Sequence, residues 1–86
     1  MKLFTTGKLA MLLNVHPSKI YRMMRRGELP SYRPEGWNYW LIPLTDEEVK
    51  ELVERFKARM EDVEKYAMSD EELKRREGVI DEKAGK

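Results

Sequence analysis

A group of hydrogen-bond donors between residues 18 and 26 is the clearest sign of chemistry in this sequence. It contains no acidic residue and consists of Ser18, Lys19, Tyr21, Arg22, Arg25 and Arg26. Guanidinium groups bind phosphate oxygens or the edge of guanine, and Lys and Ser side chains serve either role. Solvated helix faces normally mix both signs of charge, so this face indicates an anionic partner. The alternative is a basic surface helix with no partner.

The other reactive residue types do not indicate catalysis. The carboxylates lie at helical spacing beside Lys and Arg, as on solvated helix faces. His16 is the single histidine, so it cannot form a metal cluster, and the absence of cysteine excludes a thiolate site. Gly7, Gly27 and Gly36 are isolated and form no phosphate-cradling loop. We therefore expect no enzymatic activity, no metal and no cofactor.

The basic face needs a scaffold, and the spacing of residues 5–26 predicts a helix-turn-helix. Ala10 lets a second helix pack closely, Asn14 tolerates the positive φ of a turn, and Ile20 joins the second helix to the first. Thr5 can cap the first helix, and Pro17 suits the first position of the second. Residues 17–26 are therefore expected to present the basic face outward.

Apolar residues predict how these helices are held. Phe4 and Leu9 occupy the two positions of a hydrophobic staple around Thr5. Gly27 is expected to end the second helix. The inner face of that helix is formed by Ile20, Met23 and Met24.

Size and charge limit the class of protein. The chain has 86 residues, 41% of them hydrophobic, which is enough for one small domain. Residues 1–44 carry 7 − 2 = +5 charges and residues 45–86 carry 10 − 14 = −4. A basic half is expected to bind nucleic acid, and an acidic half to meet protein or solvent. With no signal peptide and no apolar run of ~20 residues, we expect a cytoplasmic protein at the nucleoid of a prokaryotic, phage or mobile-element host.

The aromatic segment SYRPEGWNYWLI predicts a β-hairpin wing. Its expected returning strand covers residues 39–42 and is stopped by Pro43. Arg33 is the expected wing contact with DNA. Trp40 is expected to fill the core beneath the hairpin, whereas Trp37 is equally consistent with packing and with exposure.

A long amphipathic helix is predicted over residues 45–68. Thr45 and Glu48 form a capping box at its start. Apolar residues then recur at spacings of three and four, at Val49, Leu52, Val53, Phe56, Met60, Val63 and Ala67. The stripe is longer than a small domain can cover, so self-association is expected through Phe56, Met60 and Val63. Residues 69–86 are expected to form a short helix and a frayed tail.

The run LFTTGKLAMLLNVHPSKIYRMMRRGELPSYR resembles the winged helix-turn-helix domain of MerR-type regulators and of excisionase-like proteins of phages and mobile elements. The resemblance covers residues 4–49 or so. It implies that residues 17–26 enter the major groove and that the wing contacts the neighbouring minor groove or backbone. The chain departs from the family pattern at Asn14, where Gly is usual, and at Leu41, where a basic residue often stands.

Together these observations predict a mainly α protein with a small β-hairpin wing, a winged helix-turn-helix followed by a long amphipathic helix. The expected divisions are residues 1–44, 45–68 and 69–86. The expected function is sequence-specific binding of double-stranded DNA, as a transcription regulator or excisionase-like accessory factor that forms a homodimer or DNA-assembled oligomer through the C-terminal helix. Two alternatives stay open, a small-terminase-like DNA-packaging subunit of a phage and a protein-interaction adaptor that has lost DNA binding. Base edges or phosphates would be met by Ser18, Lys19, Arg22 and Arg25, and phosphates by Tyr21, Arg26 and Arg33.

Overall fold

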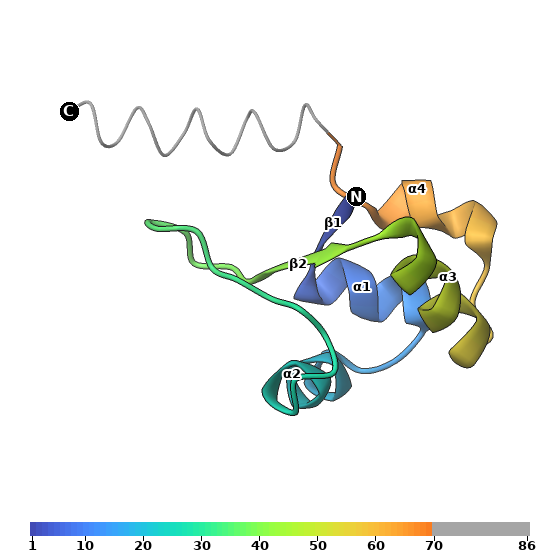
Figure 1. The fold of residues 1–86 in the computed structure, drawn as a ribbon, viewed down its shortest axis with the longest axis horizontal. Coiled ribbons are helices and arrows are strands. Elements are labelled where there is room, and N and C mark those ends of the chain that lie inside the picture. Colours follow the sequence, from blue (N-terminus) through green and yellow to red (C-terminus); the bar gives the residue numbers. More distant parts are fainter. Residues whose placement is uncertain (70–86) are drawn as a thin grey trace.

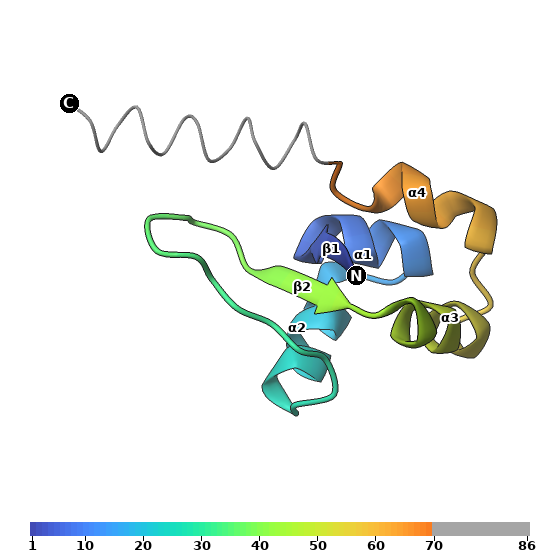
Figure 2. The same cartoon turned by 45° about the horizontal axis from the view of Figure 1, so that its top comes forward.

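The computed structural model describes residues 1–69, and helix α1 lies at its centre (Figure 1). Helices α2 and α4 lie on opposite sides of α1 in both views of the ribbon (Figures 1 and 2). The elements in chain order are β1 (Lys2–Thr5), α1 (Thr6–Leu13), α2 (Pro17–Arg25), β2 (Leu41–Leu44), α3 (Asp46–Arg55), the 3-10 helix η1 (Met60–Asp62) and α4 (Val63–Tyr66). Within the described residues, no helix has the length and apolar character needed to cross a bilayer.

The first helix and the turn after it form as predicted. The Thr5 hydroxyl accepts a hydrogen bond from the backbone N–H of Lys8 at 3.2 Å and so caps α1. Asn14 adopts φ 55°, and the next N–H, that of Val15, donates to the Ala10 carbonyl at 3.0 Å. These bonds close α1 with a left-handed residue, so Asn serves here in place of the usual glycine.

Helix α2 begins at Pro17 and ends before Gly27, as the sequence predicts. Gly27 has φ +76°, and the following N–H, that of Glu28, donates to the Met23 carbonyl at 2.9 Å. A left-handed residue with this bond is a Schellman ending, which satisfies carbonyls that the helix leaves free. The ending fixes the direction in which the chain leaves toward the wing.

The sheet differs from the predicted hairpin. Strand β2 pairs antiparallel with β1, a strand that the sequence did not predict, and Phe4 lies opposite Ile42. The segment expected to form a hairpin with residues 39–42 is an irregular loop, closed by one bridge between Tyr32 and Leu41 with N···O distances of 2.9 and 2.7 Å. We call residues 31–40 the wing. Pro34 and Gly36 limit regular pairing within it, and the bridge between Tyr32 and Leu41 holds the base of the loop.

Pro43 lies inside β2 instead of stopping it. Leu41 exchanges both of its backbone hydrogen bonds with Tyr32, on the side away from β1. Backbone groups two residues apart in a strand face the same side, so the nitrogen of Pro43 also faces away from β1. A missing N–H costs nothing at that position, since no ladder bond to β1 requires it.

The predicted helix over residues 45–68 is not continuous. Thr45 and Glu48 form the expected capping box, but α3 ends at Arg55 and Lys57 turns the chain with φ 57°. The chain then folds back, and α4 packs against α1. The spacing of apolar residues persists across the turn because α3 and α4 face the same core, so periodicity alone could not reveal the break.

This turn changes the expected self-association stripe. Val63 is buried, with 3% of its surface exposed, and belongs to the core, whereas Met60 is 52% exposed. Phe56 is partly buried and packs on the same core. The three side chains therefore do not line the one open face that the continuous helix would have given them, and pairing through them stays a prediction.

The larger of two core clusters in the described residues joins the segments on both sides of residue 45. It draws on α1, α2, the sheet, α3 and α4, and its fully buried members include Phe4, Leu9, Leu13, Ile20, Ile42, Leu44 and Val49. The predicted boundary between residues 44 and 45 thus separates segments that share this core. The predicted helix and tail beyond Ser69 lie outside the described residues.

The prediction that Trp40 fills the core is wrong, and Trp37 is buried in its place. Trp37 is the buried one, 9% exposed, and packs with Leu41, Met68 and Leu3. Trp40 is 39% exposed. In the wing turn the Trp37 N–H donates to the Pro34 carbonyl at 3.0 Å. This turn directs the Trp37 ring inward and leaves the Trp40 ring outside the core.

Candidate nucleic-acid interface

The outer face of α2 is formed by side chains that the structure leaves open to solvent. All six predicted contacts on this helix are exposed, whereas Ile20 and Met23 on its other face are buried. At ~100° per residue, Arg22 and Arg25 lie near the middle of the exposed face. In the described part of the chain no acidic side chain pairs with either of them. Their guanidinium groups are therefore ready to bind an anion.

Arg26 lies at the edge of this face and already has a partner. Its guanidinium is 3.8 Å from the Glu28 carboxylate, and Arg55 of α3 lies 3.6 Å from the other oxygen of that carboxylate. All three side chains are partly exposed, so each pair contributes little to stability. The carboxylate nevertheless offsets part of the positive charge at this edge, which makes Arg26 a weaker anion contact than Arg22.

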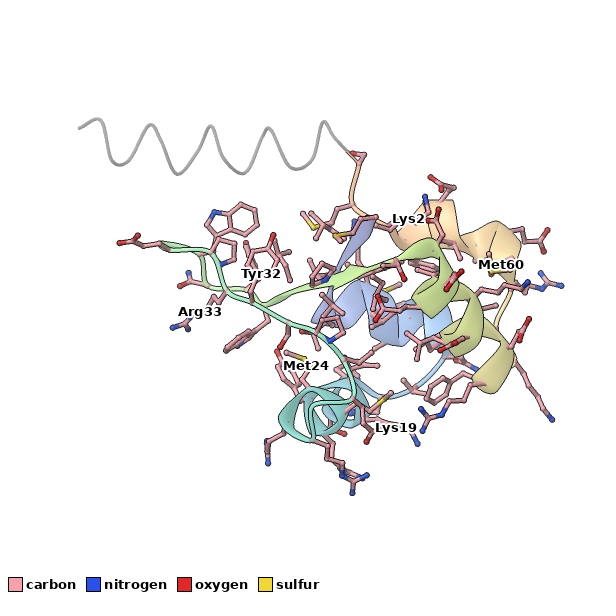
Figure 3. All side chains as sticks on the ribbon, in the orientation of Figure 1. Lys2, Lys19, Met24, Tyr32, Arg33 and Met60 are labelled. Carbon is pink, nitrogen blue, oxygen red and sulfur yellow. The ribbon has the colours of Figure 1, made fainter. Side chains whose placement is uncertain are left out.

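Lys19 also lies toward α3. Its Nζ atom is 5.5 Å from the centre of the Phe56 ring, and the Cζ atom of Arg55 is 5.4 Å from the same ring (Figure 3). Two cations on one aromatic ring join the edge of α2 to the end of α3. Arg55 is thus a basic residue beside the candidate face that the sequence did not indicate, because its position depends on the turn at Lys57.

Ser18 takes part in the N-cap of α2. The His16 Nδ1 atom accepts the backbone N–H of Ser18 at 3.1 Å and lies 2.9 Å from the Ser18 hydroxyl. Because Nδ1 accepts from the N–H, the hydroxyl must be the donor in the second contact. Ser18 therefore presents oxygen lone pairs outward, which suits a base amino group better than a phosphate. The sequence is consistent with His16 as a turn residue or a phosphate contact, and its capping role becomes visible only in the structure.

The wing carries the predicted contact Arg33 on its exposed surface. The Cζ atom of Arg33 is 5.7 Å from the centre of the Trp40 ring. Figure 3 shows Arg33 on the wing, away from the core helices. An indole ring under a guanidinium limits the freedom of both side chains. The stack holds a positive charge beside an exposed aromatic surface.

A cavity of about 210 Å³ that is open to solvent lies between α2 and the wing. Figure 3 places Met24 where α2 approaches the chain that leads into the wing. The cavity is lined by Tyr21, Met24, Arg25, Ser31 and Trp40. It brings together two predicted contacts from α2 and an aromatic wing residue that the sequence had assigned to the core.

An ion pair between Lys2 and Glu64 lies outside the face of α2 and the wing. The Lys2 ammonium donates a hydrogen bond to the Glu64 carboxylate, and this bond raises the pKa of Lys2 above its usual value. Within residues 1–69, no three side chains of His, Asp or Glu come together as metal ligands. The arrangement thus offers charge and hydrogen-bond donors to an extended anion.

A family model described as a helix-turn-helix domain matches residues 3–55, which include most of β1 and all of α1, α2, the wing, β2 and α3. No curated protein and no solved structure matches the chain.

Proposed function

Because the chain belongs to the helix-turn-helix domain family, we propose that it binds double-stranded DNA in a sequence-specific manner through α2. The observation that carries this proposal is the outer face of α2, where Arg22 and Arg25 are exposed and unpaired by acids within the described residues. The major groove of B-DNA is wide enough to admit an α-helix, so α2 can present this face to the base edges. The two arginines are assigned to guanine edges or phosphates, since Arg to guanine is the commonest specific contact.

The neighbouring side chains have more restricted roles. Ser18 accepts from a base amino group, and Lys19 contacts the backbone on the side of α3. Tyr21, on the wing side of α2, contacts a phosphate. Arg26 does so weakly because Glu28 is beside it. These assignments follow from the contacts that each side chain makes in the protein.

The wing supplies a second contact at a distance from α2. Arg33 is assigned to the backbone or minor groove next to the major groove that α2 enters. Phosphate contacts fix orientation and carry no sequence information, so Arg33 contributes affinity for all duplexes alike. This division of roles between helix and wing follows the resemblance to winged helix-turn-helix proteins.

The biological role we favour is that of a transcription regulator or an excisionase-like accessory factor. A single module typically buries only about 600–1,000 Å² on DNA, so useful specificity requires a second copy. Val63 lies in the core, which does not favour pairing in solution through the stripe after α3. Copies that assemble side by side on the DNA agree better with the burial of that side chain.

Selection of bound sequences from a random duplex pool, followed by binding titrations over a range of salt concentrations, tests the proposal. Arg22→Ala and Arg25→Ala should each weaken binding to the selected site by about 1–3 kcal/mol if they read a base. If either holds a phosphate, the salt slope should fall by about 0.9 with the preferred sequence unchanged.

Lys65→Ala provides a matched control, because it removes one positive charge from α4, on the opposite side of α1 from α2. It should change binding by less than about 0.5 kcal/mol at 0.15 M salt, where the Debye length is ~8 Å. Equal binding by the parent and the Arg22→Ala, Arg25→Ala double variant would show that α2 is not the DNA-binding helix.

A further inference from the structure

We propose that the cavity between α2 and the wing holds one deoxyribose of the DNA backbone and rejects a sugar that carries a 2′-hydroxyl. This inference rests on the proposed function and adds a site for the sugar to it. It gives Met24 and Trp40, which sequence reasoning placed in the interior, a direct contact with DNA.

The position of the cavity follows from the geometry of duplex DNA. The major and minor grooves are separated by one sugar-phosphate strand on each side. A protein that places α2 in the major groove and the wing at the neighbouring minor groove must therefore let one strand pass between them. The cavity lies at that crossing, because α2 contributes Tyr21, Met24 and Arg25 to it and the wing contributes Ser31 and Trp40.

The charges around the cavity suit a phosphodiester strand. None of its lining residues is acidic. Arg25 is on the α2 side, and Arg33 lies on the Trp40 ring at the wing side. Two guanidinium groups can thus bind the phosphates that precede and follow one sugar. The hydroxyls of Tyr21 and Ser31 add neutral donors for the same phosphate oxygens.

The apolar walls suit the sugar. Met24 is half-buried, and its sulfur lies 4.0 Å from the hydroxyl of Thr6, which is itself buried in α1. This contact holds the thioether in place from behind. The Trp40 ring is restrained by Arg33. A thioether and an indole face offer carbon and sulfur surface, which matches the C2′ methylene of deoxyribose.

The volume of about 210 Å³ leaves room for a group larger than a single water molecule. A five-membered sugar ring with its exocyclic carbon is a group of that kind.

A 2′-hydroxyl directed at the thioether and the indole face would exchange part of its hydration for carbon and sulfur surface, while the Tyr21 and Ser31 hydroxyls are engaged by phosphate oxygens. Because the cavity is open to solvent, the loss lies at the low end of the cost of an unpaired hydroxyl and weakens binding roughly fivefold. The site would therefore disfavour a ribonucleotide at one position of the bound strand. This selectivity differs from base readout, because it follows the sugar and is independent of the base above it.

A ribonucleotide scan of the selected duplex tests the inference. Single ribonucleotides are introduced one at a time, and Kd is measured by fluorescence anisotropy with the full-length protein. The parent should lose roughly fivefold in affinity at one position of the strand that crosses between α2 and the wing. In Trp40→Ala the penalty at that position should fall below about twofold.

Tyr32→Ala is the matched control, since Tyr32 is an exposed aromatic residue of the wing that does not line the cavity. It should keep the full ribonucleotide penalty. Met24→Gln offers an independent variant in case Trp40→Ala fails to fold, because a glutamine amide can bond the 2′-hydroxyl and should also reduce the penalty.

Two results would overturn the inference while leaving the proposed function intact. One is equal affinity for the DNA duplex and for every ribonucleotide-substituted duplex. The other is a penalty that persists in both Trp40→Ala and Met24→Gln, which would attribute it to the altered shape of the duplex. Failure of the parent to bind any all-DNA duplex would instead overturn the proposed function.

Discussion

The loss of stability on Val63→Ala distinguishes the folded-back arrangement of α4 from the continuous helix that the sequence predicted. Val63 is 3% exposed and lies in the core at the start of α4. Val63→Ala removes two buried methyl groups at ~0.8 kcal/mol each, and incomplete collapse of the cavity adds to the loss. We expect a loss of about 2 kcal/mol in the free energy of unfolding, which in so small a domain lowers the thermal midpoint by roughly 10 °C.

Met60→Ala is the matched comparison, because Met60 belongs to the same apolar pattern and is 52% exposed. It should change stability by less than about 0.5 kcal/mol. Urea unfolding followed by far-ultraviolet circular dichroism at several protein concentrations measures both effects. If the two variants were equally stable, or if both lost stability only on dilution, Val63 would lie on an exposed dimerising stripe and the packing of α4 on α1 would be refuted.

The other predictions concern the wing, an ion pair and α1. Trp37→Ala should destabilise the fold by about 3 kcal/mol, the low end for a buried aromatic, whereas Trp40→Ala should destabilise it by less than about 1 kcal/mol. A lower thermal midpoint for Trp40→Ala than for Trp37→Ala would contradict the assignment of Trp37 to the core. The raised pKa of Lys2 means that its hydrogen bond to Glu64 stabilises the fold at neutral pH and ceases to do so as pH rises through that pKa. Glu64→Gln should therefore cost at most about 1 kcal/mol at pH 7, and the gap from the parent should close above pH ~10; a gap constant to pH 11 would exclude this bond as its source. Gly7→Ala should stabilise α1 by about 0.5 kcal/mol, because a Cβ there meets nothing within 4 Å, and an unchanged urea midpoint would contradict this.

The helix-turn-helix was predictable because local signals fix it. Thr5, Asn14, Pro17 and Gly27 each determine the backbone within a few residues of themselves, and all four act as expected. The basic face of α2 was predictable for a related reason, since helical periodicity alone decides which side chains share a side.

The sheet and the wing were less predictable, because they depend on contacts between distant segments. The four residues of β1 are too few to show a period of their own, and they become a strand only by pairing with β2. The burial of Trp37 and exposure of Trp40 depend on a turn whose geometry composition does not specify.

The break after α3 could not be read from hydrophobic spacing. Lys57 adopts a left-handed conformation without the glycine that usually marks one, so the turn has no sequence signal. The contacts of Lys19 and Arg55 with the Phe56 ring depend on that turn, so the sequence did not predict them either.

Pro43 has a further consequence for solubility. The outer side of β1 is occupied, because the Leu3 carbonyl accepts the backbone N–H of Met68 at 2.8 Å. The outer side of β2 is bridged to Tyr32 at Leu41, and two residues later Pro43 has no N–H to donate. Each edge of this sheet thus carries, within the described residues, a feature that disfavours the addition of a strand from another molecule. These features oppose the edge-to-edge pairing that leads small β-sheets to aggregate.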